Sequence, residues 1–240
     1  WAPQVSALSA QFRTIAIDLR GHGESDAPLW SFSLDQYADD VAALLDHLDI
    51  PQAVLVGLSM GGYVSLAFSR TYGKRLLGLV LADTRAQADS PDGRTGRFHL
   101  AQTAYTQGTE TVANTMLPKL LGATSLNNKP ELVESIRRTI HQAPVSGILV
   151  DLMAMADRRD STTHLSAILC PTLVVIGEED HTTPLVDAQL MAERIPHARL
   201  AIIPAAGHVS NCEQPELFND LLRGFVEELR STAGEPNFRP

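Results

Sequence analysis

A serine, an aspartate and a histidine that could together perform acyl transfer each stand at the end of an apolar run in this 240-residue sequence. The serine is Ser59 in VLVGLSMGGYVS (54–65), with Gly57 two residues before it and Gly61 two residues after it. A sharp turn from a strand into a helix would present such a serine as a nucleophile, and the glycines would relieve crowding there. The alternative is an ordinary glycine-rich turn that contains a serine.

The residues around Ser59 favour a nucleophile. AVLVGLS (53–59) has the composition of a strand, and MGGYVSLAFSRTY (60–72) has the spacing of an amphipathic helix. The N-terminus of that helix would also favour negative charge developing beside the serine. A serine nucleophile needs a base to take its proton, and the base needs an acid to orient it.

The predicted base is His208. It follows the apolar run LAIIP (200–204) within AAGHVSN, so it would lie at the carboxyl end of a strand. Open α/β sheets place their ligands at that edge. The alternative is a loop histidine that is satisfied by local hydrogen bonds.

The predicted acid is Asp180, which ends the run LVVIGEED (173–180). As an alternative, Asp180 is a turn aspartate that caps the helix expected to begin near Pro184. Asp83 is a rival acid, because it ends the run GLVLAD (78–83) and would also lie at a carboxyl edge. We favour Asp180.

These three residues need a scaffold in which strands alternate with helices. The sequence predicts strands at 13–19, 53–59, 76–83, 171–180 and 198–208, and helices at 33–50, 60–72, 184–194 and 215–230. Ser33 is the expected N-cap of the first of these helices, and Gln36 completes a capping box. Near-continuous apolar strands joined by helices predict an α/β fold with a mostly parallel sheet that helices cover on both faces.

The pattern changes between residues 85 and 161. Four helical segments follow one another without a strand, near 97–107, 109–121, 130–142 and 145–158. We interpret this region as a helical insertion in a core formed by residues 1–84 and 162–230, and we expect a flexible tail at 231–240. The apolar stretch GILVDLMAMA (147–156) either lines an acyl pocket or packs the insertion onto the core. Arginines at 85, 94 and 97 either meet a substrate carboxylate or belong to a solvated loop.

Composition excludes several classes of function. A net charge of −9 argues against nucleic acid or an anionic membrane as the main partner. No apolar window approaches the length of a membrane span. Cys170 and Cys212 are too few for a disulfide framework, and their spacing does not indicate a metal site. The default expectation is a cytoplasmic protein, although a leader before Trp1 could have been removed.

The order Ser59, Asp180, His208 resembles that of the α/β-hydrolase superfamily. The motifs that carry the resemblance are DLRGHGES (18–25), GLSMGG (57–62), GEEDHTTP (177–184) and AGHVSNCEQPE (206–216). Within the superfamily, the chain looks most like small bacterial carboxylesterases and the 3-oxoadipate enol-lactonase group. A serine at position 59, where haloalkane dehalogenases have aspartate, argues against that branch.

The resemblance implies hydrolysis of an ester or lactone through an acyl-enzyme on a Ser-His-Asp triad. It also implies that the insertion is a cap and that the backbone N–H of Met60 donates to the oxyanion. No metal or organic cofactor is expected, the partner is a small-molecule ester or lactone, and a homodimer is left open. The alternatives are a non-catalytic hydrolase-like binding protein, an inactive fragment, or a perhydrolase or carbon–carbon bond hydrolase that uses the same triad.

The beginning of the chain departs from the family pattern. Relatives usually start with a β-hairpin and a further strand, whose His-Gly loop donates a second N–H to the oxyanion. Here the helix that normally follows that loop comes first, at Trp1. We expect that further residues precede Trp1. The alternatives are that strands 13–19 and 53–59 pair directly, or that a partner chain supplies the missing edge.

Overall fold

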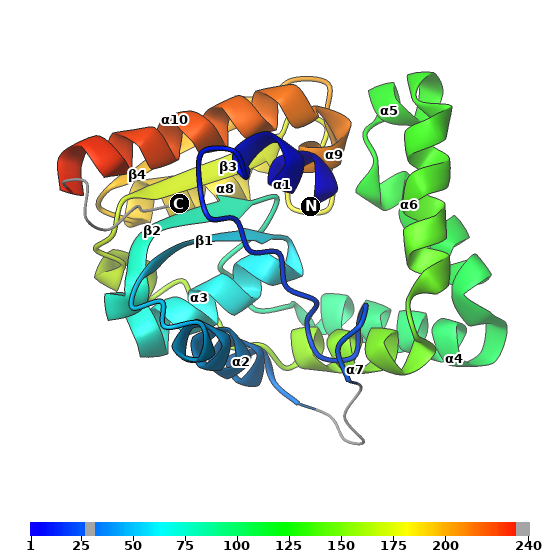
Figure 1. Cartoon of the computed structure of the whole chain (residues 1–240). Helices are drawn as coiled ribbons and strands as arrows, with labels where there is room; N and C mark the ends of the chain where they lie inside the picture. Colours follow the sequence, from blue (N-terminus) through cyan, green and yellow to red (C-terminus); the bar gives the residue numbers. More distant parts are fainter. Residues whose placement is uncertain (27–31, 234–240) are drawn as a thin grey trace.

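The computed structural model describes residues 1–26 and 32–233, and it is built around a sheet of four parallel strands (Figure 1). The strands are β1 (Ala53–Leu58), β2 (Leu76–Ala82), β3 (Thr172–Gly177) and β4 (Ala198–Ile203), and they lie in the order β1-β2-β3-β4. The middle strands, β2 and β3, are almost entirely buried. Their sequences are therefore nearly continuous apolar runs, as expected for a parallel sheet that is covered on both faces.

Helices cover the two faces of this sheet, as the alternating pattern predicted. The helix α1 (Ala2–Leu8) and the long helix α10 (Pro215–Ala233) lie on one face, and α2 (Leu34–His47) and α3 (Met60–Tyr72) lie on the other (Figure 1). The helix α8 (Leu185–Arg194) shares a core cluster with α3 and therefore covers the same face as α3. Alternate residues of β2 point to opposite sides: Val80 and Ala82 pack with Phe218 of α10, whereas Leu79 and Leu81 pack with Leu66 of α3 and Met191 of α8. One core therefore lies on each face.

Ser33 caps α2 as predicted. Its hydroxyl accepts a hydrogen bond from the Gln36 backbone N–H at 3.3 Å, and the Gln36 side chain accepts the Ser33 N–H at 2.9 Å. This capping box satisfies two of the backbone donors that a helix N-terminus leaves free.

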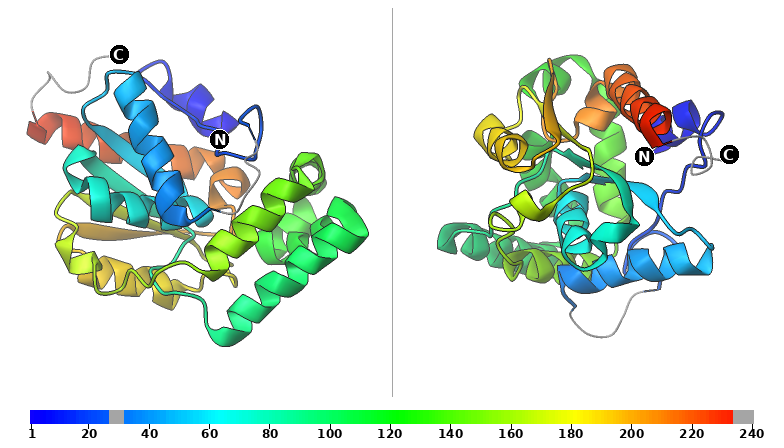
Figure 2. Two further views of the ribbon diagram at one scale, coloured as in Figure 1. Left: turned by 90° about the horizontal axis from the view of Figure 1, so that it is seen from below. Right: turned by 90° about the vertical axis from the view of Figure 1, so that its left-hand side faces the viewer.

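The helical insertion lies between β2 and β3. It contains α4 (Pro91–Leu120), α5 (Ala123–Asn128), α6 (Pro130–Gln142) and α7 (Val145–Ala156). The break predicted between two helices near residue 108 occurs inside α4 as a kink, where Gly108 has φ 79° and ψ 179°. The insertion lies at one end of the sheet, beyond the carboxyl ends of the strands (Figures 1 and 2). The exact limits of core and insertion stay predictions.

Two predictions about local structure were wrong. Residues 13–19 pair with none of the described strands, so β1 forms the outer edge of the described sheet. RTIAIDL has the composition of a strand, but a strand also needs a neighbour for its backbone hydrogen bonds. Direct pairing of 13–19 with 53–59 is therefore not observed. At the other end, residues 231–233 belong to α10 instead of a flexible tail, and 234–240 lie outside the described residues.

The loop after residues 13–19 is anchored to the insertion by side chains. His22 Nε2 lies 2.6 Å from Asp151 Oδ2 on α7, and the Tyr37 hydroxyl of α2 donates to the other oxygen of the same carboxylate. The hydrogen bond with Asp151 raises the pKa of His22, because it stabilises the protonated ring against the cost of burial. Core and insertion therefore share one polar cluster at this contact.

Candidate active site

Ser59 is the single residue between β1 and α3. Its backbone has φ 52° and ψ −112°, an unusual conformation for a residue with a side chain. Strain of this kind costs about 1–3 kcal/mol and persists only where the surroundings fix the chain. Here the Ser59 N–H donates to Ala82 O at 2.9 Å, and the Thr84 hydroxyl donates to Ser59 O at 2.8 Å. The end of β2 thus holds the strained turn that presents the serine.

The two glycines that flank Ser59 differ in their surroundings. A Cβ atom on Gly57 would collide with the carbonyl oxygen of Gly61 and with Ser65 Oγ. A Cβ atom on Gly61 would meet nothing within 4 Å. The prediction that both glycines relieve crowding therefore holds for Gly57 and is wrong for Gly61.

We expect Gly57→Ala to destabilise the protein by at least about 1–3 kcal/mol, because the new methyl group meets backbone that cannot move freely. Gly61→Ala is the matched control, since the methyl group enters open space inside a helix that prefers alanine to glycine by about 1 kcal/mol. The free energy of unfolding in urea compares the two variants. Equal destabilisation by both changes would contradict this account of the turn.

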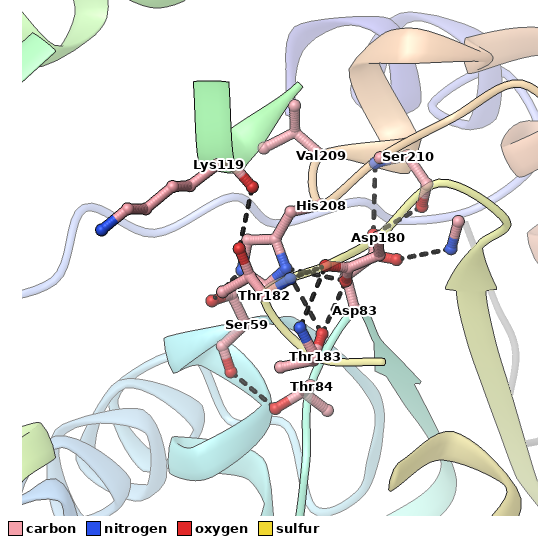
Figure 3. A network of polar contacts seen from close by, with 12 residues as sticks. Ser59, Asp83, Thr84, Lys119, Asp180, Thr182, Thr183, His208, Val209 and Ser210 are labelled. Atoms are coloured by element: carbon pink, nitrogen blue, oxygen red, sulfur yellow. Dashed lines mark hydrogen bonds and ion pairs between the residues drawn. The ribbon is translucent and has the colours of Figure 1, made fainter. Parts of the chain in front are cut away.

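His208 lies between Ser59 and Asp180 (Figure 3). Its Nε2 is 2.7 Å from Ser59 Oγ, and its Nδ1 is 2.8 Å from Asp180 Oδ2. An ionised carboxylate only accepts hydrogen bonds, so Nδ1 carries the proton and the lone pair of Nε2 faces the serine hydroxyl. His208 is 2% exposed and Asp180 is 5% exposed, so water is largely excluded from this pair.

Asp180 is held by the loop in which it lies. Its Oδ1 accepts the backbone N–H groups of Thr182 at 2.7 Å and Thr183 at 3.0 Å, and its Oδ2 accepts the Thr183 hydroxyl at 2.6 Å. Burial by itself would raise the pKa of Asp180, but the contacts with His208 and Thr183 outweigh it and hold the pKa below its usual value. The turn contacts of Asp180 therefore exist together with its contact to the histidine, but Asp180 does not cap α8, whose N-cap is Pro184 and has no side-chain hydrogen bond.

The rival acid, Asp83, has different partners. Its Oδ1 accepts the Gly177 N–H at 2.8 Å, and its Oδ2 accepts the Ser210 N–H at 3.2 Å and the Ser210 hydroxyl at 2.6 Å. Burial raises the pKa of Asp83 to about 7, although these donors favour the ionised form. The structure thus brings Asp180, and not Asp83, to the Nδ1 atom of His208.

Met60 is the first residue of α3, directly after Ser59. The N–H groups in the first turn of a helix have no partner within the helix. The backbone N–H of Met60 therefore has no partner within α3 and lies next to the serine, and its role toward an oxyanion stays a prediction.

The three arginines considered as partners of a substrate carboxylate each lie against an acidic residue of the protein. Arg94 pairs with Asp157 at 2.7 Å, Arg97 pairs with Asp89, and Arg85 lies 3.3 Å from Asp187. In the stretch 147–156, Val150, Ala154 and Met155 pack against the core cluster around α2 and α3, which favours the packing role over a pocket lining.

A cavity of about 190 Å³ lies beside α3, between the core and the end of the insertion. Its wall includes Tyr63, Arg70, Arg85 and Arg158 but none of Ser59, Asp180 and His208.

Within the described part of the chain, no cluster of three or more histidine, cysteine, aspartate or glutamate side chains is arranged to bind a metal ion. In the same residues, no helix is both long enough and apolar enough to cross a bilayer.

Comparisons with known proteins match this arrangement over most of the chain. The model of the family described as alpha/beta hydrolase fold matches residues 1–215. The chain is 33% identical to 3-oxoadipate enol-lactonase 2 from Acinetobacter baylyi over 229 residues, which are 95% of this chain and 84% of that protein.

Two solved structures extend the comparison to three dimensions. A thermophilic esterase from Thermogutta terrifontis has a TM-score of 0.92 and 40% identity, over 95% of this chain and 85% of that one. The enol-lactonase from Burkholderia xenovorans has a TM-score of 0.87 and 31% identity, again over 95% and 85%. The similarity therefore extends over both the sheet and the helical insertion.

Proposed function

Because the chain belongs to the alpha/beta hydrolase family, we propose that it hydrolyses carboxylic esters or lactones through Ser59, His208 and Asp180. The observation that carries this proposal is the unbroken hydrogen-bonded series from Asp180 through His208 to Ser59. Similarity to esterases and enol-lactonases supports the choice of an ester or lactone carbonyl as the reacting group.

The proposed reaction has two halves. In the first, Ser59 Oγ attacks the carbonyl carbon while His208 Nε2 takes its proton, and the leaving alcohol departs with that proton. Asp180 keeps Nδ1 protonated and stabilises the imidazolium that forms. In the second half, His208 takes a proton from water, the hydroxide attacks the acyl-enzyme, and Ser59 regains its proton as the acid is released.

The oxyanion that forms in each half needs hydrogen-bond donors. We assign one donor to the backbone N–H of Met60, because it follows the nucleophile at the start of α3. Losing one such donor from an enzyme of this kind costs roughly 3–4 kcal/mol of transition-state stabilisation. The positive end of the α3 dipole favours the same negative charge.

We further propose that residues 1–84 and 162–230 form the catalytic core and that residues 85–161 form a cap over it. The contacts of the insertion with the loops that carry Asp180 and His208 support this division, since Leu120 O accepts the His208 N–H and Lys119 O accepts the Thr182 hydroxyl. A cytoplasmic location stays a prediction.

The proposal is tested by turnover and by covalent labelling. We expect hydrolysis of p-nitrophenyl acetate, butyrate and octanoate, with the chain-length preference reporting the size of the acyl pocket. Diethyl p-nitrophenyl phosphate should inactivate the enzyme with one diethylphosphoryl group per chain, located on the peptide that contains Ser59 by mass spectrometry. Stoichiometric labelling elsewhere, or a folded chain with neither turnover nor labelling, would refute the proposed function.

A further inference from the structure

Glu213 is a fully buried carboxylate, five residues after His208. It ends the four-residue helix α9 (Ser210–Glu213), which follows the histidine loop directly. Its Oε1 accepts the backbone N–H of Gly207 at 2.8 Å and that of Val209 at 3.4 Å. Both neighbours of His208 in the chain are therefore bonded to one side chain.

The same carboxylate also bonds the insertion. Its Oε2 accepts the N–H of Gly122, just beyond the end of α4, at 2.9 Å. The N–H of His208 itself donates to Leu120 O at 2.9 Å. Gly207 and Gly122 approach so closely that a Cβ atom on Gly207 would collide with the Gly122 nitrogen. The histidine loop and residues 120–122 are thus joined by backbone contacts with Glu213 between them.

A carboxylate suits this position because three N–H groups converge on it. Both oxygens of a carboxylate accept hydrogen bonds, so together they can satisfy all three donors. An amide offers only one acceptor oxygen and would turn its NH₂ group toward the remaining donors. The backbone of Glu213 is also held, since the Lys129 ammonium donates to the carbonyl oxygen of that residue. The arrangement leaves the histidine loop little freedom to shift along the line toward Ser59.

We propose that Glu213 is a positioning residue that fixes His208 against Ser59 and makes the position of the histidine depend on the insertion at residues 120–122. This inference rests on the proposed function. Asp83 holds Ser210, the first residue of α9, from the side of the sheet. Glu213 differs because it bonds both the histidine loop and the insertion.

The test compares Glu213→Gln with Glu216→Gln, the same change at an exposed position three residues later. For p-nitrophenyl acetate, we expect Glu213→Gln to lower kcat by about 10- to 100-fold with KM changed less than threefold, since misplacing a catalytic group by about 1 Å costs about 10²-fold. Glu216→Gln should keep the wild-type kcat. Glu213→Asp, which keeps the charge but shortens the side chain, should fall between them.

Active-site titration with diethyl p-nitrophenyl phosphate separates positioning from folding. A merely structural role would lower the fraction of titratable sites and the melting temperature but leave kcat per titrated site unchanged. Positioning lowers kcat per titrated site. An unchanged value in Glu213→Gln would overturn the proposal, and so would an equal loss in Glu216→Gln.

Amide hydrogen exchange provides a readout that does not depend on turnover. In Glu213→Gln, the amides of Gly207, Val209 and Gly122 should exchange at least tenfold faster than in the wild type, while those of Glu216→Gln should not. If these amides exchange slowly in the wild type and faster in Glu213→Gln, but the wild type hydrolyses no ester, the proposed function fails. The contact between Glu213 and the three amides then still stands. Slow exchange that persists in Glu213→Gln would refute the contact itself.

Discussion

Replacement of Ser59 with alanine should lower kcat for p-nitrophenyl esters by about 10⁴- to 10⁶-fold, to the level that remains when a serine hydrolase loses its nucleophile. The reason is that alanine has no oxygen to form the acyl-enzyme, and His208 Nε2 then loses its partner, since the position of the hydroxyl is empty. Binding should change little, because the backbone donor at Met60 and the walls of the site are untouched.

The change keeps the Cβ atom, so it also keeps the strain of a residue with φ 52°. The melting temperature should therefore stay close to that of the wild type. Ser65→Ala is the matched control, because it removes a hydroxyl from α3, the helix that follows Ser59. The Ser65 hydroxyl donates to Gly61 O at 2.7 Å and not to any of the three proposed catalytic residues. Residual activity above about 1% in Ser59→Ala, after contaminating esterases are excluded, would point to another nucleophile.

Replacement of Asp180 with asparagine should lower kcat by about 10⁴-fold, the size of effect seen when a triad aspartate becomes an amide. An amide NH₂ directed at Nδ1 of His208 would favour the tautomer with its proton on Nε2, so the ring could no longer accept the proton of Ser59. The measurement is kcat between pH 6 and 9 with p-nitrophenyl acetate. The kcat of Asp180→Asn should rise in part at high pH but should stay below that of the wild type over the whole range.

The variant Asp83→Asn tests which of the two carboxylates, Asp180 or Asp83, orients His208. Because Asp83 bonds Gly177 and Ser210 instead of the histidine, its loss should reduce kcat far less than the loss of Asp180. Its effect should appear in stability. The pKa of Asp83 is raised to about 7 by burial, so the stability that its protonated form contributes is complete below about pH 4 and is lost as pH rises through 7.

The free energy of unfolding of Asp83→Asn should therefore vary less between pH 4 and 7 than that of the wild type. An activity loss in Asp83→Asn as large as that in Asp180→Asn would mean that the acid has been assigned to the wrong carboxylate.

The meeting of Ser59, Asp180 and His208 was predictable because each of them follows a strand of a parallel sheet. The carboxyl ends of β1, β3 and β4 share one edge, so residues placed just after them can meet although 149 positions separate Ser59 from His208. Local sequence patterns were therefore enough to predict this part of the fold. The capping box at Ser33 was equally local, since its two partners are three residues apart.

Features that depend on distant neighbours were not predictable in the same way. RTIAIDL has the composition of a strand, but whether it pairs is decided by what lies beside it. Glu213 stands in a polar stretch, and its importance depends on the approach of Gly122, 91 positions away. Gly61 looked like a packing glycine because of its symmetry with Gly57, yet only Gly57 has crowded surroundings.

The position of β1 at the edge of the described sheet bears on how a chain of residues 1–240 alone would behave in concentrated solution. An edge strand presents a row of backbone groups that can pair with a strand of another molecule, which is a common route to aggregation. The net charge of −9 opposes this, because like-charged copies repel one another. Added salt shortens the range of that repulsion to about 8–10 Å near physiological ionic strength and leaves the backbone attraction intact. Colloidal stability of this chain should thus be greatest in dilute buffer and should decline as salt is added.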